Sequence, residues 1–244
     1  MRRIFKRHRS GPPISFAKRA VDINLIILTS PIWFPLFLAC GIWIKLVSKG
    51  NCFFLQKRVG YKKEVFTIVK FRTMRENAET TIHDQYARTL AETAAPMHKL
   101  DSRDPRLIFG GGFLRASGLD ELPQFLNVLR GDMSLVGPRP CLLVELAGYR
   151  NSHRKRFDGL PGITGNWQVN GKNSTNFRRM IALDISYINN ISVKTDLEIL
   201  AKTVPALCRQ LMELLKRPSV PEYDGSEQLT DAARQAHRIP IEIP

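Results

Sequence analysis

The sequence predicts an α+β fold that is mostly helical, in which an N-terminal re-entrant membrane helix hairpin is joined to a small domain with a short β-hairpin and surface amphipathic helices. Three observations predict it: an uncharged run from Ile23 to Ile44, two strand-like segments after it, and several segments with helical periodicity. We expect three parts: a basic N-terminus with the membrane hairpin (1–50), a folded domain (51–217) and a C-terminal tail (218–244).

The composition is that of a packed protein with a local excess of positive charge. Hydrophobic residues make up 43% of the 244 residues and charged residues 24%, which excludes wholesale disorder. Residues 1–70 contain 14 basic and 2 acidic side chains, whereas residues 71–244 contain 23 and 20. Because the charge is local, we expect no nucleic-acid partner; a nucleic-acid binder is a weak alternative whose binding would be sensitive to salt.

The cysteines and histidines predict neither a disulfide framework nor a zinc site. The four cysteines show no CxxC spacing, and the five histidines form no HxxxH pair. Free thiols fit a reducing cytoplasm. Any metal is therefore expected to be a hard cation held by carboxylates and phosphates.

The uncharged run is long enough to enter a membrane. As one straight helix its 22 residues would extend about 33 Å, close to a hydrocarbon core of roughly 30 Å. No small-residue cleavage site follows, which argues against a signal peptide. A buried core helix is an alternative, but the absence of charge and the presence of Trp33 and Trp43 favour lipid.

Prolines and flanking charges favour re-entry over crossing. Basic residues flank both ends of the run, as cytoplasmic flanks do: Arg2, Arg3, Lys6, Arg7, Arg9, Lys18 and Arg19 precede it, and Lys45, Lys49, Lys57, Arg58, Lys62 and Lys63 follow it. Each proline removes a backbone donor and bends a helix. We therefore predict a membrane helix break at Ser30 and Pro31, near Pro35, with both flanks on one side; a kinked crossing helix is the alternative.

The remaining elements are predicted from periodicity and turn signals. The first are strands in FFLQKRVG and VFTIVKFRTM around a turn at 60–63, followed by a polar helix over 76–94 and a Gly-rich irregular stretch over 103–119. A helix from about Asp120 to Gly131, with Pro123 in its first turn, and a helix over 142–157 come next. A turn-rich PGITG stretch and helices over 174–188 and 194–216 complete the order.

The last of these helices carries an apolar stripe at steps of three and four residues. Its members are Leu197, Leu200, Val204, Leu207, Leu211 and Leu214. The stripe indicates either packing against the core or a helix that lies on the bilayer surface. Pairing of subunits into a homo-oligomer through this stripe is a further option.

The densest set of chemically capable residues lies in 115–140. Asp120 and Glu121 are expected to begin a helix, where exposed backbone amides favour negative charge and also attract phosphate. Arg115 precedes them, and Arg139 follows in a Gly-Pro-Arg-Pro turn; guanidinium groups suit bidentate phosphate contacts. This set predicts a phosphoryl-transfer site, although an Asp-Glu pair at a helix start is commonly simple charge placement.

Lys70 and Arg72 are candidate substrate-binding residues. They alternate with Val69 and Phe71 and so share one face of the predicted strand. Contacts to phosphate or nucleotide are one interpretation of this pair. A solvated strand face is the other.

Over roughly residues 16–205, the chain resembles the bacterial sugar transferase family, the monotopic phosphoglycosyl transferases that start glycan assembly on a polyprenyl phosphate. The matching motifs are KRAVD, Ser30-Pro31, QKRVG, KFRTM, DPRL, LDELPQFLNVLRGDMSLVGPRP and PGITGNWQV. The resemblance implies a cytoplasmic-face enzyme of the bacterial inner membrane, in contact with phospholipid. It transfers sugar-1-phosphate from a UDP-sugar donor to a polyprenyl phosphate acceptor and releases UMP.

The resemblance also implies roles for the site residues. Asp120 attacks the phosphate that carries the sugar and forms a covalent intermediate, and Glu121 helps Asp120 hold Mg²⁺. Arg115 and Arg139 bind phosphate, and Ser30 with Pro31 makes the membrane segment re-entrant. Two rival schemes stay open: direct attack by the acceptor without a covalent step, and a non-catalytic membrane scaffold.

Two departures from the family pattern affect these expectations. Gly118 stands where members often have serine, just before the proposed nucleophile, and relaxes the backbone there. The stretch from 76 to 100 is longer than in the smallest members, which suggests a part in sugar selection. The sugar itself stays open, since related transferases handle glucose, galactose and N-acetylated amino sugars.

Overall fold

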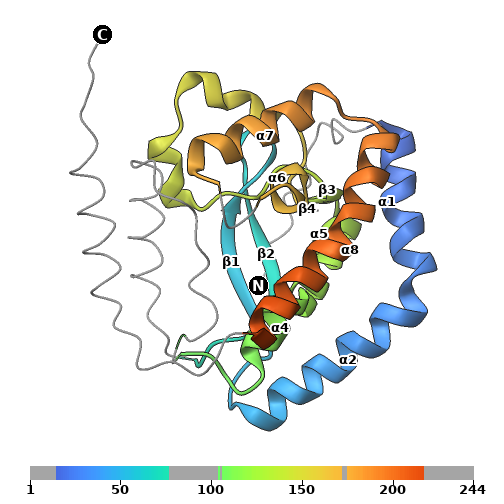
Figure 1. Ribbon diagram of the computed structural model, residues 1–244, viewed down its shortest axis with the longest axis vertical. Helices are drawn as coiled ribbons and strands as arrows, with labels where there is room; N and C mark the ends of the chain where they lie inside the picture. Colours follow the sequence, from blue (N-terminus) through green and yellow to red (C-terminus); the bar gives the residue numbers. More distant parts are fainter. Residues whose placement is uncertain (1–14, 77–103, 105, 172–174, 217–244) are drawn as a thin grey trace, which may run out of the picture.

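The computed structural model describes residues 15–76, 104, 106–171 and 175–216 (Figure 1). Two N-terminal helices run along one side of a mostly helical domain that contains a two-stranded antiparallel sheet. The predicted mostly helical α+β class is therefore confirmed. The predicted helix over 76–94 falls outside the described residues except for Glu76, and the predicted tail, 218–244, lies outside them entirely.

The uncharged run forms two helices, not one. Helix α1 (Phe16–Leu28) and helix α2 (Ser30–Val47) meet at an angle at Thr29, and Pro31 lies in the first turn of α2. At the joint, Trp33 Nε1 donates to Ile26 O at 2.8 Å, and Thr29 Oγ1 donates at 2.6 Å to Leu25 O, which also accepts from Thr29 N. Side chains next to the break thus supply hydrogen-bond donors to its carbonyl groups, which helps a broken helix in lipid.

Helix α2 is also the one helix in the described part of the chain whose length and composition would allow it to cross a membrane. Only 11% of its residues are buried within the protein, whereas a core helix of a soluble domain is mostly buried. Ile32, Ile42 and Leu46 are each more than half exposed. Its surface is therefore apolar and largely uncovered.

Helix α1 docks onto the domain through buried charged side chains. Lys18 Nζ donates to Asp196 Oδ2 at 2.6 Å, to Val136 O at 3.0 Å and to Tyr187 Oη at 3.1 Å. Arg19 donates to the carbonyl groups of Val128 and Leu129. Two of the basic residues that the sequence assigned to a solvated flank are thus used inside the protein.

The predicted β-hairpin is present. Strand β1 (Phe53–Val59) and strand β2 (Val65–Phe71) pair in antiparallel register, with Phe53 opposite Phe71, and a 3-10 turn, η1 (Tyr61–Lys63), joins them. Stacked rings of Phe53 and Phe71 lie beside Phe37 of α2, so the base of the hairpin packs against this helix.

The stretch over 103–119 is not wholly irregular, contrary to the prediction. Helix α4 (Gly111–Ser117) occupies its second half and buries Leu114. Gly110 and Gly118 bound the helix with left-handed backbones at φ 77° and 74°. The glycines that suggested irregular chain are therefore caps of a short helix.

The predicted helix over 142–157 is also wrong. The chain instead forms two 3-10 segments, η3 (Leu143–Gly148) and η4 (Asn151–Asp158). They bury two charged residues, Glu145 and Arg156, which pair with Arg139 and Asp184. A continuous α-helix would place Glu145 and Arg156 at a different distance from each other. Their buried ion pairs therefore favour the two separate 3-10 segments.

A second, parallel strand pair was missed by the sequence reading. Strand β3 (Ser134–Val136) pairs with β4 (Gly162–Thr164), which lies inside the stretch that was predicted to be only turns. Each strand has three residues, too few for a periodic signal. The short helix α6 (Asn166–Val169) follows directly.

Helices α7 (Phe177–Asn189) and α8 (Val193–Lys216) close the described domain and confirm the two predicted C-terminal helices. Leu200 packs against the main core, and Leu207, Leu211 and Leu214 are half-buried, whereas Leu197 and Val204 are 49% and 64% exposed. Asp196 and Ile199 of the same helix are buried. Four of the six stripe residues are thus partly covered by the protein, as core packing predicts, and the buried Asp196 is an addition that the stripe did not include.

Candidate active site

Asp120 lies on a 3-10 segment, η2 (Leu119–Gln124), between α4 and helix α5 (Phe125–Arg130). The predicted helix thus ends where expected, at Gly131, but begins with 3-10 turns rather than α-helix. Gly118 has a left-handed backbone, and a Cβ there would meet Leu207 Cδ2 at 3.2 Å. Glycine suits this position for both reasons, which explains the departure from serine in structural terms.

Apolar neighbours fix the position of Asp120 against the membrane-type helix. Leu119 and Leu122 pack on a cluster that includes Ile44 of α2 and Phe71 of β2. Asp120 itself is only 9% exposed, and it lies close enough to the Cys40 thiol of α2 for its charge to act there. The carboxylate is therefore held beside a helix whose other faces are apolar and exposed.

Glu121 is brought together with a predicted substrate-binding residue. Lys70 Nζ lies 3.0 Å from Glu121 Oε1, with side chains 24% and 32% exposed. Lys70 is fixed by the strand that carries it, because Asn127 accepts a hydrogen bond from Val69 N at 3.0 Å and donates one to Thr67 O at 2.8 Å. This buried asparagine connects α5 to β2 and so sets Lys70 opposite Glu121.

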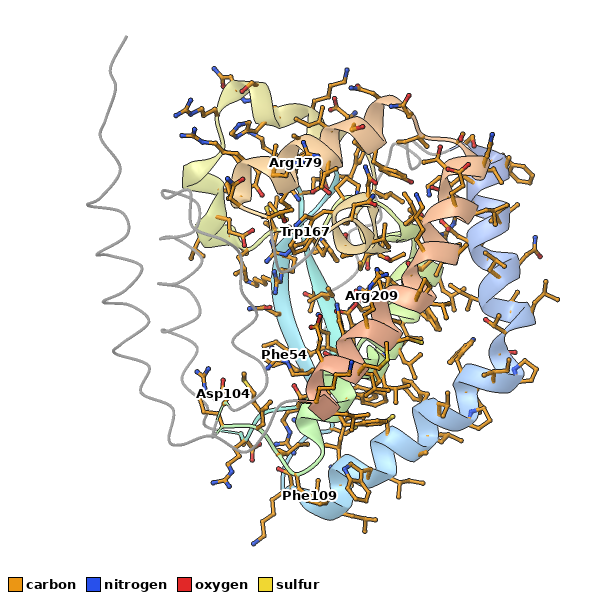
Figure 2. All side chains as sticks on the ribbon, viewed as in Figure 1. Phe54, Asp104, Phe109, Trp167, Arg179 and Arg209 are labelled. Atoms are coloured by element: carbon orange, nitrogen blue, oxygen red, sulfur yellow. The ribbon has the colours of Figure 1, made fainter. Side chains whose placement is uncertain are left out.

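Arg139 forms an ion pair with the buried Glu145, in which Nη1 donates to both carboxylate oxygens, at 3.0 Å to Oε1 and 2.9 Å to Oε2. Burial alone would raise the pKa of Glu145, but the Arg139 guanidinium outweighs it and holds that pKa below its usual range. Arg139 also lies over the ring of Trp167, near the centre of the domain (Figure 2). Its planar group is therefore held in one orientation.

Arg58 adds a cation that the sequence did not single out for a role. Its Nη1 donates to Pro140 O at 3.3 Å, in the same turn as Arg139. Burial, together with the neighbouring Arg139 charge, lowers the pKa of Arg58 to about 10, which leaves it charged at neutral pH. The charge of Glu121 also reaches Arg58. Arg58 is therefore close enough to both Arg139 and Glu121 for their charges to act on it.

Arg115 and Arg72 lie on elements next to the site. Arg115 is in the last turn of α4, three residues before the glycine that begins η2. Arg72 follows β2 and is 7% exposed; its Nη2 lies 3.3 Å from Ser48 Oγ, while Nε and Nη1 are buried without a hydrogen-bond partner in the described structure. The roles of both as phosphate or substrate contacts stay predictions.

The donor set is compatible with Mg²⁺ that is shared with a substrate. Among the described residues no group of three or more Asp, Glu, His or Cys side chains could hold a metal alone. Mg²⁺ is usually bound through one or two carboxylates together with substrate phosphates. Asp120 and Glu121 offer two adjacent carboxylates, so they suit that kind of site rather than a closed protein cage.

Three residues that organise the site were missed by sequence reasoning: Arg58, Asn127 and Glu145. Arg58 stands in a shared motif but carried no assigned role. Asn127 interrupts the apolar run FLNVL. A polar residue in such a run indicates a buried side chain that forms hydrogen bonds, so this signal was available in the sequence. Glu145 gave no signal, because its partner is known only once the chain is folded.

Glu145→Gln is expected to lower the free energy of unfolding at neutral pH by about 3 kcal/mol, since it leaves Arg139 without its buried counter-ion. The lowered pKa of Glu145 means that its contribution is complete above about pH 4.3 and disappears as pH falls through the lower, folded-state value. The variant should therefore lose stability less steeply in acid. Urea unfolding between pH 7 and 3 measures the free energy of unfolding of both proteins, and Glu213→Gln, which changes an exposed glutamate, is the control. If the free energy of unfolding of Glu145→Gln falls with pH as steeply as that of the wild type, the prediction is contradicted.

Comparison with known proteins gives consistent matches over most of the chain. Residues 14–210 match the family described as bacterial sugar transferase. The exopolysaccharide production protein ExoY of Sinorhizobium fredii is 38% identical over 194 residues, which cover 79% of this chain and 85% of that protein.

Two further relatives have names that state a reaction. A UDP-glucose:undecaprenyl-phosphate glucose-1-phosphate transferase of Caulobacter vibrioides is 38% identical, covering 80% of this chain and 70% of its own length. An undecaprenyl-phosphate galactose phosphotransferase of Salmonella typhimurium is 35% identical, and the match covers 80% of this chain and 41% of that protein.

Proposed function

The chain belongs to the bacterial sugar transferase family and is a phosphoglycosyl transferase, and from this we propose that it transfers a sugar-1-phosphate from a UDP-sugar to undecaprenyl phosphate and releases UMP. The observation that carries the proposal is the place of the Asp120–Glu121 pair. Asp120 lies beside the buried side of α2, whose outer face is apolar, while Glu121 contacts Lys70 and its charge reaches Arg58, the neighbour of Arg139. One side suits a lipid substrate and the other a nucleoside diphosphate.

In the first step, an Asp120 carboxylate oxygen bonds to the phosphorus that carries the sugar. The bond from this phosphorus to the bridging oxygen of the diphosphate breaks, and UMP leaves with the electron pair. The fixed cations Arg58 and Arg139 stabilise the negative charge that gathers on the leaving group. The sugar phosphate is then held on Asp120 as an acyl phosphate, a mixed anhydride of the carboxyl group and the phosphate.

In the second step, a phosphate oxygen of the lipid acceptor attacks the same phosphorus. The bond to the Asp120 oxygen breaks, which restores the carboxylate and yields a polyprenyl diphosphate sugar. A proton on the incoming phosphate passes to Glu121, which Lys70 holds in place at 3.0 Å. The transfer thus consists of two successive substitutions at the same phosphorus, each of which inverts its configuration, and Asp120 is the nucleophile in the first and the leaving group in the second.

Asp120 and Glu121 are the residues that would hold Mg²⁺, together with the substrate diphosphate. When bound, Mg²⁺ supplies neutralisation of the diphosphate charge. Glu121 would keep its ion pair with Lys70 or exchange it for the metal. Asp120 needs no such partner in order to stay near the reacting phosphorus, because its neighbours Leu119 and Leu122 fix it through packing.

We also propose that α1 and α2 form a re-entrant hairpin in the inner membrane, with the domain on the cytoplasmic face. The break at Thr29, where Trp33 donates to Ile26 O, and the exposed apolar surface of α2 support this. At the far end of α2, Trp43 Nε1 donates to Phe109 O at 3.2 Å, and Phe109 itself is 76% exposed (Figure 2). Aromatic side chains of this kind favour the membrane interface.

Release of UMP tests the proposed function. The purified full chain, with a panel of UDP-sugars and undecaprenyl phosphate, is expected to release UMP from at least one donor, and only when the lipid phosphate and Mg²⁺ are present. Coupled detection of UMP measures the rate, with undecaprenol as the control acceptor. No UMP from any donor, together with intact membrane binding, would favour a non-catalytic scaffold instead.

A further inference from the structure

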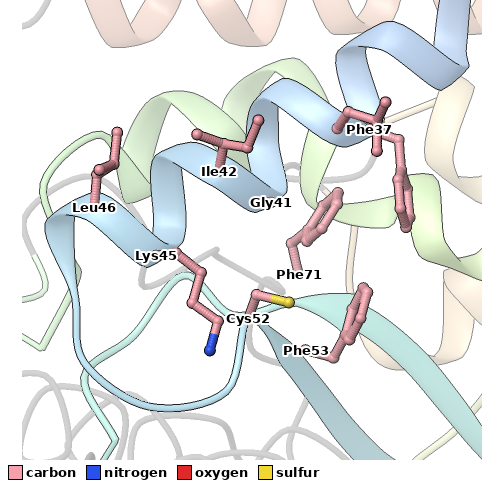
Figure 3. Close-up of a pocket in the computed structure, with 9 residues that line it drawn as sticks. Phe37, Gly41, Ile42, Lys45, Leu46, Cys52, Phe53 and Phe71 are labelled. Carbon is pink, nitrogen blue, oxygen red and sulfur yellow. The ribbon is translucent and has the colours of Figure 1, made fainter.

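The membrane hairpin contacts the domain through two kinds of surface. Helix α2 packs on the base of the β-hairpin through aromatic rings, and beside this contact lies an open apolar groove lined by Phe37, Cys52 and Phe53 (Figure 3). Apolar contacts of this kind are not directional. Helix α1 instead contacts the domain through buried hydrogen bonds, which depend on both distance and angle. The bonds of α1 therefore set its register against the domain.

These bonds run from one face of α1 to strand β3. The Asp22 side chain is buried, and its Oδ2 accepts from Ser134 Oγ at 2.7 Å while its Oδ1 accepts from Leu135 N at 3.2 Å. One turn earlier on the same face, Lys18 Nζ donates to Val136 O at 3.0 Å. All three residues of β3 are thus hydrogen-bonded to α1.

Helix α1 takes the place of a second strand beside β3. In the described part of the chain β3 pairs with β4 alone, so one of its edges has no strand next to it. All of β3 is buried, and buried backbone groups without partners cost free energy. The α1 side chains supply partners there, together with the hydroxyl of Tyr187, which donates to Val136 O at 3.0 Å. The position of β3 therefore depends on α1 as well as on β4.

Strand β3 leads directly into the Gly-Pro-Arg-Pro turn that carries Arg139. This turn is closely packed, since a Cβ at Gly137 would lie 2.3 Å from Leu160 O. It is also bonded to the start of β4, where Gly162 N donates to Pro138 O at 2.9 Å. Strand β3, the turn and β4 thus form one packed unit, and a shift of β3 displaces the Arg139 backbone.

Arg139 is sensitive to such a shift because its side chain is held at the far end. The guanidinium is bonded to Glu145 and lies 6.0 Å from the centre of the Trp167 ring. If the backbone moves while these partners stay in place, the planar group must turn away from its orientation. A misplacement of about 1 Å in an active site can cost on the order of 100-fold in rate.

Asp22 differs from the other charged residues of α1 in what it holds. The Lys18–Asp196 ion pair joins α1 to α8, and Arg19 donates to carbonyl groups of α5. In the described structure both hydrogen bonds of the Asp22 carboxylate go to β3. Loss of this carboxylate therefore releases β3 while the other attachments of α1 stay intact.

From these contacts we propose that Asp22, in the membrane hairpin, is a positioning residue for Arg139. By holding β3, it sets the orientation in which the Arg139 guanidinium meets the donor diphosphate. The inference rests on the proposed function and adds to it a second task for α1. The helix that enters the membrane also fixes the phosphate site.

Three variants of α1 separate positioning from stability. Asp22→Ala removes both acceptors from β3. Asp22→Asn keeps the size of the side chain: its oxygen can accept from Leu135 N, and its amide can donate to the Ser134 hydroxyl, which accepts as well as donates. Ile26→Val, one turn further on the same buried face, loosens the packing of α1 without removing a hydrogen bond.

The test measures UMP release by the full chain in nanodiscs, with donor and acceptor varied in turn. In a two-step reaction through Asp120, kcat/KM for the donor reports only the first step, and kcat/KM for the acceptor only the second. Asp22→Ala is expected to lower the donor value at least about tenfold and to keep the acceptor value within about twofold. Asp22→Asn should restore the donor value. Ile26→Val should change the two values equally, because a smaller folded fraction affects both steps.

A double-mutant cycle tests whether Asp22 acts through Arg139. Arg139→Lys keeps a cation beside the buried Glu145 but loses the planar group that suits a diphosphate. It should lower the donor kcat/KM, and the addition of Asp22→Ala should lower it no further. Effects that multiply in the double variant would overturn the inference. An equal fall of both kcat/KM values in Asp22→Ala, or no rescue by Asp22→Asn, would overturn it as well.

Equilibrium binding of UDP to the full chain separates this inference from the proposed function, because binding needs no turnover. Asp22→Ala should weaken the affinity for UDP about tenfold without changing the stoichiometry, and Asp22→Asn should restore it. Equal affinities of wild type and Asp22→Ala refute the inference alone. No UMP release from any donor, with a UDP affinity that still depends on Asp22, refutes the reaction and leaves the positioning role in place.

Discussion

Replacing Asp120 with asparagine is expected to reduce turnover by at least about 10³-fold while the protein stays folded and membrane-bound. Asparagine keeps the size of the side chain, and the packing of Leu119 and Leu122 that positions η2 does not depend on the charge. The neutral amide cannot act as the nucleophile that forms the acyl phosphate, so the first step stops. UMP release under saturating donor and acceptor measures the loss.

Asp158→Asn provides a matched control, because Asp158 is exposed at the end of η4 and far from any proposed contact with substrate. Its turnover should equal that of the wild type. Retention of more than a tenth of the activity by Asp120→Asn would contradict the role of Asp120 as nucleophile and would favour direct attack by the acceptor.

Lys18→Met is expected to lower the free energy of unfolding by about 3–5 kcal/mol. The Lys18 and Asp196 side chains are each 3% exposed, and their ion pair joins α1 to α8. Without the lysine, the buried Asp196 carboxylate keeps only the hydroxyl of Tyr187, at 2.6 Å, as its side-chain partner. Methionine fills a similar volume, so the loss reports the uncompensated charge rather than a cavity.

Denaturant unfolding of the detergent-solubilised protein, followed by tryptophan fluorescence, measures this effect. The control is Lys194→Met, which removes an exposed lysine from the first turn of α8 and should change stability by less than about 0.5 kcal/mol. A loss below 1 kcal/mol in Lys18→Met would show that the ion pair does not hold the N-terminal helices to the domain.

Elements with local signals were predictable from the sequence. The β-hairpin follows from two short runs that contain aromatic and β-branched residues around a turn, and α7 and α8 follow from periodicity over more than ten residues. The joint between α1 and α2 falls one residue before the predicted Ser30-Pro31. In each case the residues that decide the structure are neighbours in the chain.

Elements that depend on distant partners were not predictable. The pair of β3 and β4 has three residues a strand and depends on a parallel partner nearly thirty residues away. The 3-10 path of η3 and η4 follows from buried ion pairs such as Arg156–Asp184, 28 residues apart. The burial of Asp196 in α8 depends on its ion pair with Lys18, 178 residues away. Periodicity within one segment contains no information about such pairs.

The same division holds in the candidate site. Asp120 and Glu121 were identifiable because they are adjacent and precede a recognisable run. The contact between Glu121 and Lys70 spans 51 residues, and the engagement of Arg139 by Glu145 replaces an expected free guanidinium with one that is already paired. The sequence thus identified the candidate carboxylates but not the contacts that orient Lys70 and Arg139.

A covalent phosphosugar on Asp120 is the central claim, and mass spectrometry of the protein after incubation with UDP-sugar in the absence of acceptor tests it most directly. The account predicts a mass increase of one sugar phosphate on the peptide that contains Asp120, absent from Asp120→Asn and discharged when polyprenyl phosphate is added. An unmodified peptide from protein that turns over normally with both substrates would contradict the account.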